Sequence, residues 1–578
     1  MVELARHFFG PYRRWLVAGP LMKTLEVVFD LLTPLVIAWM IDSGVRQQDG
    51  SVVVRGAVAL VLFAFCGFGF TLVCQKMASL ASQGMGTDVR RALFAAVNRF
   101  SFADIDRFGT PSLITRVTND VNQLQVAVAM LIRQVIRWPV LAVGAIVCAL
   151  AIDPVLGAVF CLCLPATLTV FYLVMRRSIP YFSSMQAKLD RIGTIVREAL
   201  SGVRVVRAFS REGFEERRFE RAAADQAADA VAAGRLSALL NPSTFLILNA
   251  GICAILWLGA GQVWAGDLQQ GELMALIGYM NQVLVSVAYI ANLVVIFTRA
   301  QASAERVCEV LRWEPSVKDP GGEVPAAVPG ACAVAFEDVS FAYPGAGRRA
   351  LEDVSVKLAP GEVLGVIGGT GSGKSTFANL VGRFYDVSAG SVCMLGTDVR
   401  DWPFAGLRPV VSFVPQESAL LSGTIRDNLC WRDASATDEE LWEALERAQA
   451  ADFVRSRPEG LDAPVEAGGK NFSGGQRQRL CIARAIVGAP RVLVMDDAAS
   501  ALDYATDARL RAALGSWEGA PARIVVSQRV ASVRHADRIL VLDRGRVAGL
   551  GTHEELVERC PVYRETCLSQ LEREEVLA

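Results

Sequence analysis

The chain is long, close to neutral and rich in apolar residues. It has 578 residues, a mass of 62.3 kDa, a formal net charge of −1, 52% hydrophobic residues and a mean hydropathy of +0.35. This length exceeds one ordinary domain, and the near-zero charge argues against nucleic acid as a partner. The three histidines are far apart in the sequence, which argues against a histidine-based metal site. The 13 cysteines form no C-x-x-C pair, so we expect buried thiols in a reducing compartment.

Apolar segments long enough to cross a hydrocarbon core of roughly 30 Å occur six times before residue 300. The third and fourth are separated by Asp153-Pro154, a tight turn signal. No cleavable signal precedes the first. The six predicted spans are Trp15–Ile41, Ala57–Leu80, Leu131–Ile152, Val155–Met175, Leu239–Val263 and Leu273–Phe297.

Two long connections, Ala81–Met130 and Arg176–Ser237, carry most of the arginines of this half. Positive charge marks the cytoplasmic side, so we expect a multi-pass protein of the cell (inner or plasma) membrane with both termini in the cytoplasm. Apolar residues recur at helical spacing in these connections, which predicts helices that extend beyond the bilayer. Their turns, near Phe102–Pro111 and Ser210–Phe214, could touch another domain. The alternative is a solvated helix pair without a partner.

Lys23, Glu26 and Asp30 share one face of the first predicted span. Ionisable groups at membrane depth are often functional, so Glu26 and Asp30 could line a cavity and favour polar or cationic cargo. An internal pair in which Lys23 neutralises Glu26 is the equally weighted alternative.

A stretch rich in Pro and Gly, Trp313–Pro329, marks a domain boundary. After it, short β-branched strands alternate with helical stretches, which predicts an α/β domain with a largely parallel sheet. We therefore predict an all-α transmembrane domain over 1–312 with six helices and long cytoplasmic extensions, a linker over 313–329, and an α/β domain over 330–578.

The pattern G-x-x-x-x-G-K-[ST], a phosphate-binding loop, occurs once, between an apolar run (Val363–Ile367) and a helical stretch. Glycines let backbone N–H groups turn toward phosphates, and a helix start adds partial positive charge. Lys374 would reach the β- and γ-phosphates, and Ser375 would coordinate Mg²⁺. The chain is therefore predicted to bind a nucleoside triphosphate through Gly368, Gly369, Thr370, Gly371, Ser372, Gly373, Lys374, Ser375 and Thr376.

A second apolar strand, Val492–Met495, is followed by Asp496 and Asp497. An acidic residue at the end of such a strand, near a phosphate loop, suits water-mediated binding of Mg²⁺. Between the two strands lies the run Asn471-Phe-Ser-Gly-Gly-Gln476.

Ser473, Gly474, Gly475 and Gln476, with the Arg-Gln-Arg-Leu after them, closely resemble the signature motif of ATP-binding cassette (ABC) proteins. Tyr343 looks like the aromatic that stacks on adenine in that family. Gln416 resembles the glutamine that contacts Mg²⁺ and couples to the membrane domain, and Ser500–Asp503 resembles the loop that crosses between two cassettes.

The membrane half is also similar to this family, through Leu113–Asp120 and Glu198–Phe209. The resemblance covers essentially the whole chain and is to an exporter half-transporter of the type IV fold. It implies that ATP and Mg²⁺ are cofactors, with Ser375, Gln416 and Asp496 at the metal. It also implies that two cassettes close head to tail, so that the phosphate loop of one and the signature serine of the other sandwich each ATP. One chain has one of each, so it must dimerise.

The chain departs from the family pattern at two residues of the nucleotide site. Asp497 stands where the catalytic glutamate is expected, and Gln528 stands where a switch histidine is expected. Asp is shorter than Glu by one C–C bond, roughly 1.5 Å, and misplacement near that size can cost about 100-fold in rate. Gln528 can bond a phosphate oxygen but has no titratable imidazole. A weaker departure is Ala467, where an acidic cross-talk residue is expected.

The signature motif is intact, whereas Asp497 and Gln528 depart from the pattern expected for hydrolysis. This contrast predicts that the chain is the subunit with the degenerate nucleotide site in a heterodimeric, multidrug-type exporter. Its cargo would be amphipathic compounds, drugs or lipids, and its partner a second half-transporter. Three alternatives remain: an importer on the exporter fold, a homodimeric exporter, and a regulatory membrane subunit that senses nucleotide. Substrate, direction, partner identity, the residual hydrolysis rate and the role of Glu26 and Asp30 are beyond the sequence.

Overall fold

The computed structural model describes residues 2–517 and 519–571. Contacts divide the chain into two compact units, and each is described by itself. The membrane unit comprises 1–97 and 111–313, and the cassette unit comprises 98–110 and 314–578. The short segment 98–110 therefore belongs with the cassette, although it interrupts the sequence of the membrane unit.

Within the described residues, six helical stretches are long and apolar enough to cross a membrane, as the sequence predicted. The Asp153 side chain accepts a hydrogen bond from the Leu156 backbone N–H and caps the fourth span, whose first residue is Pro154. The spanning helices are α2 (Arg13–Trp39), α3 (Gly50–Val97), α7 (Arg137–Ile152), α8 (Pro154–Ser201), α11 (Leu240–Ala265) and α12 (Gln270–Arg312).

The long connections are helical, which confirms the prediction from their periodicity. The second turn begins at Gly202, earlier than the predicted Ser210, because α8 ends at Ser201 and a separate helix, α9, follows. The remaining helices before residue 313 are α1 (Val2–Phe8), η1 (Gly10–Tyr12), π-helix η2 (Met40–Val45), α4 (Phe102–Phe108), which belongs to the cassette unit, α5 (Thr110–Thr115), π-helix η3 (Arg116–Asp120), α6 (Val121–Arg133), α9 (Val203–Ala208) and α10 (Glu212–Ala238).

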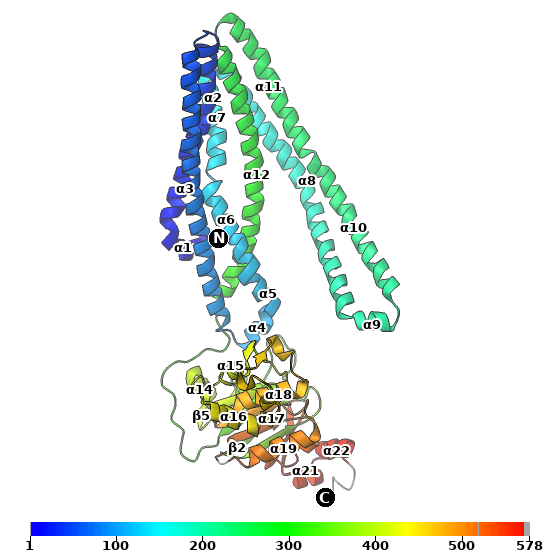
Figure 1. Cartoon of the computed structure of the whole chain (residues 1–578). Coiled ribbons are helices and arrows are strands. Elements are labelled where there is room, and N and C mark those ends of the chain that lie inside the picture. Colours follow the sequence, from blue (N-terminus) through cyan, green and yellow to red (C-terminus); the bar gives the residue numbers. More distant parts are fainter. Residues whose placement is uncertain (1, 518, 572–578) are drawn as a thin grey trace. The chain divides into compact units, whose positions relative to one another are not determined.

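Helices α8, α10 and α11 form a long hairpin that diverges from α2, α3, α6 and α7 within the membrane unit (Figure 1). It joins the rest of that unit where α8 meets α7 and α11 meets α12. Large apolar side chains on the hairpin are exposed, among them Leu162, Leu246, Trp257 and Phe209. Such an apolar surface is ordinary for a helix in lipid or against another subunit.

The charged face of α2 is internally paired. Lys23 Nζ lies 2.5 Å from Glu26 Oε2, as the second of the two sequence interpretations held. Arg137 of α7, which the sequence analysis did not single out, bonds both Glu26 (2.8 Å) and Asp30 (3.1 Å). The two carboxylates are therefore neutralised by two cations, and they present no uncompensated negative charge to a cargo.

The expectation of buried thiols is wrong for part of the set. Cys66, Cys161 and Cys253 are exposed on the surface of the membrane unit. Cysteine behaves as a small hydrophobe, so a position facing lipid suits it as well as a core position does.

The cassette unit contains two main sheets, a four-stranded sheet in the order β2-β1-β4-β5 and a six-stranded sheet in the order β12-β11-β3-β10-β9-β6. The pairs β3–β10, β9–β10, β3–β11 and β6–β9 are parallel, as the α/β prediction required. The strands are β1 (Val334–Phe341), β2 (Leu351–Leu358), β3 (Val363–Ile367), β4 (Ala389–Met394), β5 (Thr397–Asp398), β6 (Val411–Val414), β7 (Gly423–Thr424), β8 (Pro464–Val465), β9 (Val492–Asp496), β10 (Ala522–Val526), β11 (Arg538–Asp543) and β12 (Arg546–Gly551).

Helices cover these sheets and complete two large cores. One core contains the strands around β3 together with α13, and the other contains α15 to α18 with the far face of β9. The helices are α13 (Lys374–Val381), η4 (Val399–Asp401), α14 (Phe404–Val410), α15 (Ile425–Leu429), α16 (Asp438–Arg447), α17 (Ala451–Arg455), η5 (Gly460–Asp462), η6 (Ala467–Gly469), α18 (Gly474–Ile486), α19 (Tyr504–Gly515), α20 (Val530–Val533), α21 (His553–Arg559) and α22 (Pro561–Gln570).

Helix α4, the first predicted turning point, packs within the cassette unit. The Phe102 and Phe384 rings lie 4.7 Å apart, and Tyr385 donates a hydrogen bond of 3.2 Å to Asp106. The Ser316 backbone N–H donates to the buried carboxylate of Asp104 at 3.0 Å. The solvated-pair alternative therefore does not hold for this connection.

Candidate nucleotide-binding site

The phosphate loop lies between β3 and α13, as the sequence predicted. Gly371 and Gly373 have φ values of +76° and +102°, which L side chains rarely adopt. A Cβ on Gly373 would come within 2.6 Å of the Ala350 carbonyl oxygen. Glycine is therefore required at this position both by conformation and by space.

A cavity of about 350 Å³ opens over this loop. It brings together side chains from segments far apart in the sequence: Tyr343, the loop, Gln416, the end of β9 and the segment after β10. Gly368 and Gly369, the first two residues of the loop, do not line the cavity. The lining residues are Tyr343, Ala350, Thr370 to Thr376, Gln416, Asp496, Asp497, Val526, Ser527 and Gln528.

Lys374 is buried and folded back onto its own loop. Its Nζ donates to the carbonyl oxygens of Gly368 and Gly369, both at 2.8 Å. Burial lowers the pKa of the ammonium, and the carboxylates of Asp496 and Asp497 oppose that shift. The lysine is therefore held at the loop and can exchange carbonyl partners for phosphate oxygens.

Ser375 and Asp496 meet at the point where a hard cation would be held. The Ser375 hydroxyl donates to Asp496 Oδ1 at 3.2 Å. Burial raises the pKa of Asp496, and the nearby Asp497 raises it further, while the Ser375 bond lowers it. Hydroxyl, carboxylate and the amide oxygen of Gln416 at the cavity wall are oxygen donors of the kind that Mg²⁺ prefers, so the residues present fit that ion.

The two residues that depart from the family pattern lie on one side of the cavity. Asp497 has φ +49°, and its backbone N–H donates to the Val526 carbonyl at 2.9 Å. The backbone that presents this short carboxylate is thus fixed by β10. Gln528 is exposed, and its backbone carbonyl accepts from Gln570.

Tyr343 is held by its neighbours at another part of the cavity wall. Its hydroxyl and the Thr376 hydroxyl lie 3.0 Å apart, and its ring meets those of Phe341 and Tyr385 edge to face. The ring is therefore positioned by packing and by a hydrogen bond to the first turn of α13.

The signature residues lie outside this cavity, at the start of α18. Ser473 is the N-cap, with its hydroxyl accepting from the Gln476 N–H at 3.3 Å and its own N–H donating to Gln476 Oε1 at 3.0 Å. Ser473 and Gly474 are exposed. The chain therefore presents its signature at the surface and not to its own phosphate loop.

Sequence reasoning missed three residues of the cavity wall, Ala350, Val526 and Ser527. Ser527 follows β10 and its backbone N–H donates to the Val366 carbonyl of β3 at 3.1 Å, which places it beside the loop. Ala350 precedes β2 and contributes the carbonyl that crowds Gly373. The position of Ser527 at the end of a strand was a usable signal, whereas Ala350 carries none.

Residues 16–287 match the model of the ABC transporter transmembrane region, and residues 351–500 match the ABC transporter model. These matches, with the cavity and signature described above, define a membrane transporter with its own ATP-binding cassette. The chain belongs to the ABC transporter family and has the exporter-type architecture.

Relatives match along nearly the whole chain. An uncharacterized ABC transporter ATP-binding protein of Mycobacterium tuberculosis is 38% identical over 577 residues, which is 99% of this chain and 98% of the relative. The ATP-dependent lipid A-core flippase of Desulfotalea psychrophila is 30% identical over 82% of this chain and 83% of its own length. The solved structure of a bacterial Atm1-family ABC exporter with ATP bound is 25% identical, with a TM-score of 0.78, and covers 96% of this chain and 98% of that one.

Proposed function

We propose that this chain is one subunit of a heterodimeric, ATP-driven exporter that moves amphipathic compounds, drugs or lipids across the cell membrane. It binds ATP with Mg²⁺ at its own weakly hydrolytic site and donates its signature to a competent site on the partner. Both termini lie in the cytoplasm. The proposal depends on one contrast: the signature at the start of α18 is intact, whereas two residues of the nucleotide site, Asp497 and Gln528, depart from the family pattern.

Dimerisation is supported by the position of the signature. Ser473 and Gly474 are exposed and contribute nothing to the cavity over the chain's own phosphate loop. In a closed ABC site, ATP lies between a phosphate loop and a signature motif. The cavity of this chain supplies the phosphate loop alone, which is half of such a site. A second cassette therefore supplies the missing half, in line with the family resemblance.

Weak hydrolysis is supported by the chemistry of Asp497 and Gln528. A base or orienting group must come within hydrogen-bond reach of the attacking water. The Asp497 carboxylate is short, and the backbone bond to Val526 holds its main chain in place. Gln528 provides an amide where a titratable ring is expected. The site therefore binds ATP firmly and cleaves it slowly.

The remaining residues of the cavity bind and orient the nucleotide. Lys374 contacts the terminal phosphates, the loop N–H groups surround the remaining phosphate oxygens, and Tyr343 stacks on the base. Ser375, Asp496 and Gln416 would hold Mg²⁺, which would supply charge neutralisation at the phosphates. ATP binding then draws two cassettes together and shifts the membrane helices between two states.

An amphipathic cargo is favoured by the relatives and by the membrane unit. One relative is named as a flippase of lipid A-core, an amphipathic lipid. In the membrane unit, the carboxylates Glu26 and Asp30 of α2 are paired with Lys23 and Arg137, so these two groups do not favour a simple cation as cargo. Import on the same fold, a homodimer and a nucleotide-sensing subunit are the outcomes that the following experiment separates.

The test compares the chain purified alone with the chain purified with a co-encoded half-transporter. We expect slow ATP hydrolysis by the lone chain, fast hydrolysis by the pair, and ATP-dependent uptake of a fluorescent lipid into inverted vesicles by the pair. Glu→Gln in the partner should stop both activities. Brisk hydrolysis by the lone chain would establish the homodimer. ATP-dependent loss of preloaded lipid from the inverted vesicles would establish import, and hydrolysis without movement of lipid in either direction would favour the sensing role.

A further inference from the structure

A second cavity, of about 650 Å³, lies in the cassette unit and shares no lining residue with the nucleotide cavity. Its volume falls in the range of small-molecule sites. Four segments line it: 98–102 before and at the start of α4, 315–319 after α12, Arg383 and Phe384 after α13, and Phe404 and Arg408 of α14.

The charged residues of this cavity are mostly basic: four cations and one carboxylate line it. The carboxylate, Asp319, accepts hydrogen bonds from the backbone N–H groups of Gly321 (3.0 Å) and Phe404 (3.2 Å). Both donors bond the same oxygen, Oδ1, and no ion pair joins Asp319 to a basic residue of the cavity among the described residues, so the cavity lining keeps an excess of positive charge. The basic residues are Arg99, Lys318, Arg383 and Arg408.

Two of the four cations are paired with carboxylates outside the cavity. Lys318 lies 2.6 Å from Glu314, and Arg383 lies 3.0 Å from Asp386. In the part of the chain that the structure describes, Arg99 and Arg408 have no ion-pair partner. The cavity therefore keeps two uncompensated guanidinium groups.

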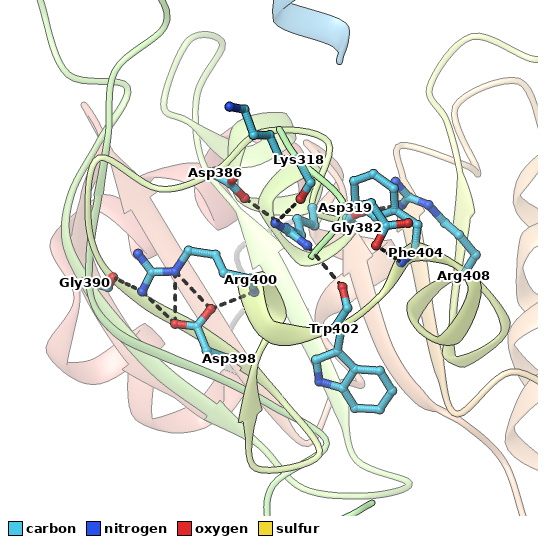
Figure 2. Close-up of polar contacts among 11 residues, drawn as sticks. Lys318, Asp319, Gly382, Asp386, Gly390, Asp398, Arg400, Trp402, Phe404 and Arg408 are labelled. Carbon is cyan, nitrogen blue, oxygen red and sulfur yellow. Dashed lines mark hydrogen bonds and ion pairs between the residues drawn. The ribbon is translucent and has the colours of Figure 1, made fainter. Parts of the chain in front are cut away.

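Arg408 is positioned at the cavity mouth by two aromatic rings. Its guanidinium carbon lies 5.1 Å from the centroid of Phe384 and 5.2 Å from that of Phe404. One nitrogen, Nη1, donates to the Gly382 carbonyl, and no described residue accepts from Nε or Nη2. Figure 2 shows Arg408 beside Gly382 and Phe404. Burial, and secondly the nearby Arg383, lower the pKa of Arg408.

We propose that this cavity binds a small, soluble, phosphate-bearing compound, whose phosphate is held by Arg408 and Arg99. Guanidinium groups bind phosphate oxygens in pairs through parallel N–H donors, and a planar fork held in place by packing loses little freedom on binding. Phe102, Phe384 and Phe404 offer an apolar wall for the organic part of the ligand.

A lipid headgroup is the other source of phosphate, and the length of α3 argues against it. This helix continues past Leu80, the end of the predicted span, to Val97. At 1.5 Å per residue, that is about 25 Å beyond the apolar span, and Arg99 follows immediately. The ligand is therefore expected to come from the aqueous phase.

The ligand would join segments that connect the two units of the chain. Residues 98–102 follow α3, and 315–319 follow α12, whereas Arg383 and Arg408 belong to the cassette core. A compound bound to all of them stabilises this arrangement by mass action. The site shares no lining residue with the nucleotide cavity and is therefore separate from that of ATP.

The experiment uses the full-length chain, alone and with its partner, in detergent. A non-hydrolysable ATP analogue with Mg²⁺ saturates the phosphate loops, so that any further binding of radiolabelled pyrophosphate occurs elsewhere. We expect one additional saturable site per chain. Arg408→Gln should weaken it at least about tenfold, since it removes charge-assisted hydrogen bonds, and Arg408→Lys should weaken it less.

Arg400→Gln is the matched control. Arg400 is also an exposed arginine of the cassette unit, and it does not line the cavity. Its guanidinium donates hydrogen bonds to the Asp398 carboxylate and to the Gly390 carbonyl, as Figure 2 shows. Thermal unfolding of each variant separates loss of binding from loss of fold. Competition by AMP in preference to a short-chain phosphatidic acid supports a soluble ligand, and the reverse order would assign the site to lipid.

Three results would overturn the proposal. The first is the absence of saturable binding once the phosphate loops are filled. The second is equal weakening by Arg400→Gln and Arg408→Gln, which would mean non-specific attraction by charge. The third is binding to the lone chain that disappears in the assembled pair, which would make the partner polypeptide the occupant of the cavity.

Discussion

The nucleotide cavity and the signature helix differ in how far each keeps the family pattern. In the cavity, the parts that hold nucleotide are complete, with Lys374 on its loop and Ser375 beside Asp496. The parts that would cleave it, Asp497 and Gln528, are both altered. At α18, by contrast, Ser473 makes a complete capping box and is exposed. This difference is the basis of the proposal that the chain binds ATP and donates its signature while it hydrolyses ATP slowly.

The largest expected effect tests the binding part of this comparison. Lys374→Ala removes the ammonium that lies at the loop, so ATP affinity at this chain's site should fall at least about 100-fold, since several charge-assisted contacts are lost. Equilibrium binding of a fluorescent ATP analogue measures it. Lys357→Ala, at an exposed lysine of β2, is the control and should leave affinity unchanged. Equal affinities in the two variants would contradict the assignment of the loop.

The next test restores the family residues at positions 497 and 528. Asp497→Glu combined with Gln528→His lengthens the carboxylate and supplies an imidazole, so hydrolysis at this site should rise about 10- to 30-fold, because misplacement of the orienting group is corrected. The rate is measured in the pair with the partner's own site inactivated. An unchanged rate would place the weakness elsewhere in the site.

Removal of the signature hydroxyl tests the other side of the comparison. Ser473→Ala should lower hydrolysis by the pair about tenfold through the lost contact to the partner's nucleotide, and should cost about 1 kcal/mol through the lost cap. Thr437→Ala removes the equivalent capping box of α16, which lies outside the site. The control should therefore lose similar stability and no activity. If Ser473→Ala and Thr437→Ala lowered activity equally, the effect of Ser473 would be explained by its contribution to folding alone.

The smallest effect concerns the membrane unit. Arg137→Gln leaves Glu26 with Lys23 and leaves Asp30 without its ion pair, so we expect a loss of about 1 kcal/mol and a fall of about one to two degrees in Tm. The loss is modest because Glu26 keeps Lys23 as a partner and only the pair of Asp30 is lost. Arg133→Gln, at an arginine of α6 with no ion pair among the described residues, should leave Tm unchanged. A larger loss in the control would contradict the pairing.

Much of this molecule could be predicted from local signals. The six spans follow from apolar length, β3 and β9 follow from short apolar runs, and the phosphate loop follows from a fixed spacing of glycine, lysine and serine. Each of these depends on neighbours in the sequence, because hydrophobic length, strand burial and loop conformation are local properties. The departures at Asp497 and Gln528 were visible for the same reason.

Other features depended on contacts between distant segments. The sequence showed Lys23, Glu26 and Asp30 on one face of a helix, but the tertiary structure alone brought Arg137 of another helix to two of them. The sequence indicated that the turn near Phe102–Pro111 could touch another domain, and the structure assigned 98–110 to the cassette unit. The structure alone gathered Arg99 and Arg408, more than 300 residues apart, around one cavity. Long-range contacts of this kind leave no periodic or spaced pattern along the chain, because they are set by the packing of whole elements.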